Sequence, residues 1–209
     1  YGGIDGSVTT FAVVSGVVGA HLSPTIILIL GVANLVGDGF SMAASNYSGT
    51  RTERQEKEAL RAQESRHIDA DAAGEREEVR QIFSAKGFSG QSLEAAVEIV
   101  TADRDRWIGF MLSEEYGLPV QIHSPWKAAF STFNAFLLCG AVPLVPFALR
   151  SPHALTVSMT CTLVVFFAIG SIKSRWLVVS WWKAGLETLV IGGLAALLAY
   201  VAGVFLKNV

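Results

Sequence analysis

The stretch RTERQEKEALRAQESRHIDADAAGEREEVR, residues 51–80, opens a charged segment that continues to residue 117. Of the 18 Asp and Glu residues in the chain, 15 lie within this segment. The other three are Asp5, Asp38 and Glu187. Because carboxylates are the preferred ligands of hard divalent cations, this concentration indicates a water-facing segment that handles cations.

The sequence on both sides of the charged segment is strongly apolar, and 51% of the 209 residues are hydrophobic. The longest apolar runs cover residues 12–36, 128–149, 155–172 and 184–206. Each is close to the ~20 residues that an α-helix needs to cross a bilayer. The pattern favours an all-α integral membrane protein over a soluble domain.

Five membrane helices are expected, with the charged segment inserted between the second and the third. Their approximate ranges are residues 4–22, 25–47, 126–149, 154–172 and 183–206. No Gly-Pro break follows the second span, so we expect its helix to continue to about Ile68. The expected domains are then residues 1–48 with the first two membrane helices, 49–122 as a helical metal-binding insert, and 123–209 with the last three.

Stop signals divide the rest of the insert into short helices. We expect one helix over 75–85, another beginning near Ser92 and interrupted at 101–103, and a last one ending near Gly117. Their shared core is expected to contain Ile82, Phe83, Leu93, Val97, Ile99, Trp107 and Phe110. In the third membrane span, Pro143 and Pro146 should kink the helix or end its regular part.

The distribution of basic residues predicts the orientation in the membrane. If the five spans alternate, only Arg150 and Lys207 of the 16 Lys and Arg residues lie on the far side. The positive-inside rule therefore places the insert in the cytoplasm.

Composition also excludes several classes of protein. The chain has a formal charge of −2 and a pI near 6.1. It therefore lacks the overall excess of basic residues that is typical of nucleic-acid-binding proteins. Cys139 and Cys161 lie in apolar spans without C-x-x-C spacing, so neither a disulfide framework nor a zinc ribbon is indicated. Because Tyr1 leads almost directly into a span without a signal pattern, we expect a further N-terminal segment upstream.

The insert carries donor side chains at separations of three or four residues, which share a helix face. These are Glu64 and His67, Glu75 and Glu78, and Met111 and Glu115. Oxygen, nitrogen and sulfur donors on three helices could converge on divalent metal. On spacing alone, a solvated helix face with i,i+4 ion pairs is the favoured alternative.

A second set of polar side chains lies inside the first two spans. Asp5 is in the first span, and Asn34, Asp38 and Met42 recur every four residues in the second. A carboxylate at membrane depth costs several kcal/mol and commonly marks an ion pathway. Glu187, beside Lys183 at a span end, is more simply explained by pairing or by reaching the interface.

Five stretches together resemble the vacuolar iron transporter family. They are Asp5-Gly6, GVANLVGDGFSM at 31–42, FMLSEEYGL at 110–118, VPLVP at 142–146 and GLETLVIGGLAA at 185–196. The resemblance implies five membrane helices per subunit, a homodimer and a cytosolic helical domain after the second helix. It further implies export of Fe²⁺ from the cytosol, with Mn²⁺, Co²⁺ or Zn²⁺ as other ions. Proton counterflow would drive export into a vacuole-type organelle or across a bacterial inner membrane.

The resemblance also assigns roles to residues. Asp5 would be the pore carboxylate and Met42 the methionine of the path, while Asn34 stands where some members have glutamate. The insert glutamates of the metal site would be Glu64, Glu75, Glu78 and Glu115, with Met111 as a thioether. His67 stands where a further glutamate is expected and adds an imidazole to the site.

Two alternative functions remain at this point. A membrane-anchored iron sensor or buffer would explain the insert, although an anchor needs no polar face within the membrane. A di-iron oxidase would require two Glu-x-x-His pairs. Since Glu64 to His67 is the only such pair in the sequence, we do not expect an enzyme.

Overall fold

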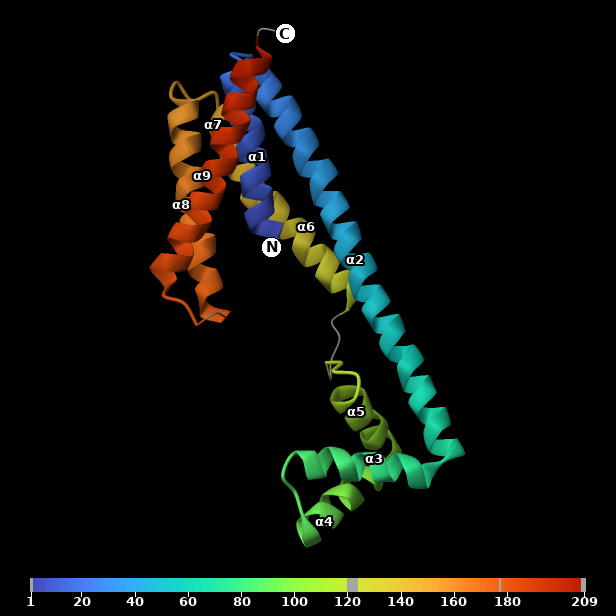
Figure 1. Cartoon of the computed structure of the whole chain (residues 1–209). Coiled ribbons are helices and arrows are strands. Elements are labelled where there is room, and N and C mark those ends of the chain that lie inside the picture. Colours follow the sequence, from blue (N-terminus) through green and yellow to red (C-terminus); the bar gives the residue numbers. More distant parts are fainter. Residues whose placement is uncertain (1, 120–123, 177, 208–209) are drawn as a thin grey trace. The chain divides into compact units, whose positions relative to one another are not determined.

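The computed structural model describes residues 2–119, 124–176 and 178–207 (Figure 1). Within these ranges all regular structure is helical, which confirms the predicted all-α class. The chain divides into two compact units, one formed by residues 1–47 and 126–209, the membrane unit, and the other by residues 48–125, the insert unit.

Five helical segments in the described residues are long and apolar enough to cross a membrane. They are α1 (Gly2–Gly19), α2 (Pro24–Ala70), the segment Pro125–Ala148 that begins with α6 (Pro125–Ala141), the segment Ala154–Trp176 that contains α8 (Ala154–Lys173) and η2 (Ser174–Trp176), and α9 (Trp181–Leu206). The five predicted spans are thus confirmed, with ends that shift by a few residues. The first span ends at Gly19 because His21 adopts a left-handed φ of 56° and the Leu22 amide donates back to Val17.

Prolines shape the helix ends as the sequence predicts. Pro24 begins α2, where its missing N–H costs no hydrogen bond. In the third span, α6 gives way to the 3-10 turn η1 (Val142–Leu144) and the short helix α7 (Val145–Ala148). Pro143 and Pro146 each lie near the start of one of these pieces. The regular helix therefore ends where a backbone donor is lost.

Small residues allow α1 to lie close to its neighbours in the membrane unit. A methyl group added at Gly6 would overlap the Phe136 carbonyl of α6, and one at Gly203 of α9 would overlap the Gly16 carbonyl of α1. The core of this unit is apolar and fills the spaces beside these contacts. Its buried members are Phe11, Val14, Val17, Ile27, Leu35, Phe136, Leu144, Phe147, Phe166 and Ala196. Close backbone approach of this kind is typical of packed membrane helices.

Helix α2 is continuous over 47 residues, which confirms the predicted extension beyond the second span. The insert unit continues with α3 (Ala72–Ala85), α4 (Gly90–Thr101) and α5 (Arg104–Glu114). The Asp71 side chain caps α3 by accepting from the Gly74 amide at 2.9 Å, and the Asp103 side chain caps α5 by accepting from Arg106 at 2.8 Å. These caps supply partners for first-turn amides that the helices leave free.

The insert unit has its own hydrophobic core. Its buried residues are Ile68, Val79, Val97, Trp107, Ile108, Met111 and Leu112, with Ile82, Phe83, Leu93 and Phe110 packed against them. The expectation for Ile99 was wrong, because this side chain is 61% exposed. Ile99 follows Val97 by two residues on α4, and this spacing turns it to the opposite face of the helix.

Candidate functional site

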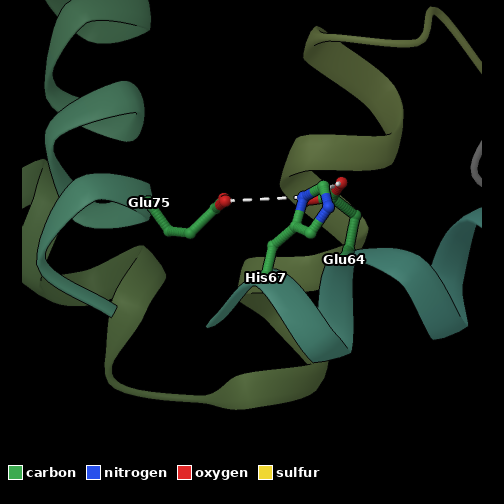
Figure 2. A group of neighbouring side chains, drawn as sticks. All are labelled: Glu64, His67 and Glu75. Carbon is green, nitrogen blue, oxygen red and sulfur yellow. Dashed lines mark ion pairs between the residues drawn. The ribbon is translucent and has the colours of Figure 1, made fainter. Parts of the chain in front are cut away.

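The end of α2 and the start of α3 bring three donor side chains together. Glu64 and His67 lie one turn apart near the end of α2, and the capped turn at Asp71 reverses the chain into α3. Glu75 in the first turn of α3 then faces back toward α2, and the three side chains point toward one another (Figure 2).

The geometry of this cluster suits one small cation. Ligand atoms of Glu64, His67 and Glu75 all lie within 4.8 Å of one another. His67 Nδ1 is 3.6 Å from Glu64 Oε1 and 3.6 Å from Glu75 Oε1. The Glu64 side chain is only 1% exposed and that of Glu75 11%, whereas His67 is 47% exposed. The imidazole therefore lies between two shielded carboxylates and the solvent.

Two carboxylate oxygens in the cluster have unmet bonding capacity. Oε2 of Glu64 and Oε2 of Glu75 are buried and find no hydrogen-bond partner among the described residues. A buried, unpaired carboxylate oxygen is costly, so such an atom requires a proton or a cation. Oxygen donors with one imidazole nitrogen are a suitable set for a divalent first-row metal ion.

Electrostatics link this cluster to two more of the predicted ligands. Burial raises the pKa of Glu75, and the charges of Glu78 and Glu64 raise it further. Burial likewise raises the pKa of Glu115, with Glu64 and Glu78 adding to the effect. His67 opposes both shifts. The carboxylates of Glu64, Glu75, Glu78 and Glu115 therefore repel one another, and a bound cation would relieve this repulsion.

The remaining predicted ligands of the insert lie outside this group of three. Glu78 is exposed one turn along α3, and Glu115 is exposed as the C-cap of α5. Met111 lies one turn before Glu115 and is fully buried in the insert core. The structure therefore brings the ligand atoms of Glu64, His67 and Glu75 close enough together to share one ion. It places Met111 among apolar side chains.

Sequence reasoning missed Tyr116. Its hydroxyl donates a hydrogen bond of 2.9 Å to Glu64 Oε1. Burial, followed by the hydrogen bond to Glu64, raises the pKa of Tyr116 further above neutral pH, where a tyrosine hydroxyl is already protonated and can donate. The available signal was its position directly after Glu115 in the quoted stretch 110–118.

The polar residues of the membrane unit lie on α1 and α2. The Asn34 amide of α2 donates to the Thr9 hydroxyl of α1 at 3.3 Å, and that hydroxyl donates to the Asp5 carbonyl at 2.9 Å. Thr9, which was not among the predicted site residues, therefore links the two helices one turn from Asp5. Asp38 is exposed and close enough to Asp5 for their charges to interact. Met42 is half-buried and packs against the membrane-unit core.

Comparison with known proteins gives matches over almost the whole chain. The model of the VIT family matches residues 1–204. The vacuolar iron transporter of Plasmodium berghei (strain Anka) is 28% identical over 220 residues, which cover 100% of this chain and 81% of the relative. That of Toxoplasma gondii (strain ATCC 50861 / VEG) is 29% identical over 221 residues, covering 100% and 73%. Vacuolar iron transporter 1 of Arabidopsis thaliana is 28% identical over 202 residues, covering 94% and 80%.

Proposed function

Because this chain belongs to the VIT family, we propose that it moves Fe²⁺ out of the cytosol in exchange for protons. Its relatives are named as iron transporters, and the family's members are transporters rather than enzymes. The destination would be a vacuole-type organelle or the far side of a bacterial inner membrane, with Mn²⁺ and Co²⁺ as further substrates. The observation that carries the proposal is the Glu64, His67 and Glu75 cluster with its two buried, unpartnered carboxylate oxygens.

The cluster would collect metal before transport. Glu64, His67 and Glu75 supply part of a coordination shell, and the exposed carboxylates of Glu78 and Glu115 can complete it or bridge to a second ion. Fe²⁺ accepts such mixed oxygen and nitrogen ligation, whereas a thiolate set would hold a soft metal permanently. Solvent-exposed carboxylates at the edge would let the ion leave.

Within the membrane unit, Asp5 is the proposed site of exchange. A carboxylate in a low-dielectric setting needs neutralisation, and either a proton or a cation can provide it. Met42 would add a soft ligand, and Asp38 or Asn34 would add polar support on the same face of α2. Metal would bind the ionised carboxylate and leave when a proton replaces it on the acidic side.

The orientation and the assembly complete the proposal. The basic residues favour an insert that faces the cytoplasm. We propose a homodimer, because five helices with small-residue faces leave the charged path incompletely walled and a symmetric partner would close it. Single cysteines placed along α1 would cross-link between subunits, and a strictly monomeric protein in detergent and in lipid would refute the dimer.

Uptake by sealed proteoliposomes tests the transport function. Under anaerobic conditions that preserve Fe²⁺, vesicles with an acidic lumen should accumulate iron faster than vesicles without a pH gradient. A Glu64→Gln and Glu75→Gln double variant should slow uptake at limiting Fe²⁺, while Glu98→Gln, on an exposed part of α4, should not. Metal binding without any uptake would instead support the anchored sensor or buffer.

A further inference from the structure

Tyr116 is the one hydrogen-bond donor that the structure places on the most deeply buried carboxylate of the insert, among the residues described. Its hydroxyl lies 2.9 Å from Glu64 Oε1. The other oxygen of that carboxylate, Oε2, is buried and unpartnered within the described part of the chain. Before any metal binds, one oxygen of Glu64 therefore accepts a hydrogen bond and the other does not.

Two features of the fold fix the position of Tyr116, namely the packing of its ring and the turn of its backbone. Its ring packs against the insert core that contains Met111 and Leu112. Its backbone lies between the end of α5 and Gly117, which has a left-handed φ of 65°. The Leu118 amide then donates back to the Leu112 carbonyl at 3.0 Å and closes the turn. The hydroxyl is thus positioned by packing rather than by the metal site itself.

We propose that Tyr116 is a positioning and specificity-determining residue of the metal site. By donating to Oε1, the oxygen that also lies 3.6 Å from His67 Nδ1, Tyr116 occupies one acceptor site of the carboxylate and fixes its orientation, so that Glu64 binds an ion through one oxygen rather than two. This inference rests on the proposed function, because it assumes that Glu64 is a metal ligand. Partners that orient a ligand in this way commonly change metal affinity by 10- to 100-fold when they are removed.

Single-oxygen ligation favours some ions over others. Ca²⁺ takes six to eight oxygen ligands and often binds carboxylates through both oxygens. First-row transition ions accept fewer ligands and also bind the His67 imidazole, which Ca²⁺ does not favour. A Glu64 carboxylate with one oxygen held by Tyr116 therefore disfavours Ca²⁺ and leaves the site suited to Fe²⁺ and similar ions.

The test compares Co²⁺ and Ca²⁺ binding by the full-length protein in detergent. Tyr116→Phe keeps the ring and removes only the hydroxyl, and Tyr200→Phe on α9 is the matched control. We expect Tyr116→Phe to weaken Co²⁺ binding by about 10-fold or more, to make Ca²⁺ a stronger competitor for the Co²⁺ site, and to alter the visible spectrum of bound Co²⁺. Tyr200→Phe should change none of these.

A double-mutant cycle separates action through Glu64 from a general effect on folding. In a Glu64→Gln background, at Co²⁺ concentrations raised to fill the weaker site, Tyr116→Phe should change affinity by less than about twofold. An equal loss in both backgrounds, or an unchanged preference for Co²⁺ over Ca²⁺, overturns the role of Tyr116 while leaving the metal site intact. If the wild-type protein binds no Co²⁺, the proposed metal site itself is refuted, and the role of Tyr116 with it.

Discussion

Replacing Glu75 by Gln should stabilise the metal-free insert and weaken its metal binding, two effects of opposite sign. Burial and the charges of Glu78 and Glu64 raise the pKa of Glu75. The folded state therefore disfavours the ionised carboxylate, and a neutral side chain of the same shape removes that penalty. The same substitution deletes one of the three donors within ligand distance of one another.

The magnitude follows from the separation of the charges. Ionised carboxylate oxygens of Glu64 and Glu75 at most 4.8 Å apart repel by at least about 3.5 kcal/mol at an effective dielectric constant of about 20. The half-exposed imidazole of His67 and the solvent offset much of this, so we expect a net gain of about 1–2 kcal/mol. Local opening of α3 should become roughly 5- to 30-fold rarer.

Hydrogen exchange of the full-length protein in detergent measures this opening directly. Amides of α3 in metal-free Glu75→Gln should exchange more slowly than in the wild type, whereas Glu98→Gln should match the wild type. Co²⁺ at about 100 times its Kd should protect wild-type α3 by about 2.7 kcal/mol, and the variant by much less. Faster exchange in metal-free Glu75→Gln would refute the idea that like charge destabilises the empty cluster.

Three other predictions test the charge of the insert, the membrane carboxylate and the helix packing. The pKa values of Glu75 and Glu115 are raised in the folded insert. At any pH between about 4.3, the pKa of a glutamate in the unfolded chain, and these raised pKa values, the folded insert therefore binds more protons than the unfolded chain. The melting temperature of the metal-free protein should therefore rise as pH falls through this window and fall as pH rises through the folded pKa, and saturating Co²⁺ should reverse the trend. Asp5→Asn should abolish pH-driven Fe²⁺ uptake by proteoliposomes and leave the Co²⁺ affinity of the insert site unchanged; uptake at the wild-type rate would make Asp38 the residue to test. Gly203→Ala should lower the free energy of unfolding in detergent by about 1–3 kcal/mol because its methyl group meets the Gly16 carbonyl, while Gly193→Ala, with open space around it, should not.

The sequence by itself determined the elements of this protein. Spans of about 20 apolar residues, prolines at helix starts and kinks, and glycine stops are local signals, and each predicted helix exists in the structure. The long α2 was predictable for the same reason, since nothing between Tyr47 and Ile68 breaks a helix. Helix faces could also be inferred from spacing, which is why Glu64 and His67 were correctly expected to lie together.

Only the tertiary structure decided which donors meet and what each of them touches. The reversal at Asp71 brings Glu75 to Glu64, while Met111 enters the apolar core and Ile99 turns outward to water. Helical periodicity places a side chain on a face, but the angle between packed helices decides what that face contacts. The bond from Tyr116 to Glu64 joins residues 52 positions apart in the sequence, and it exists because the turn after α5 is closed against the core of the insert.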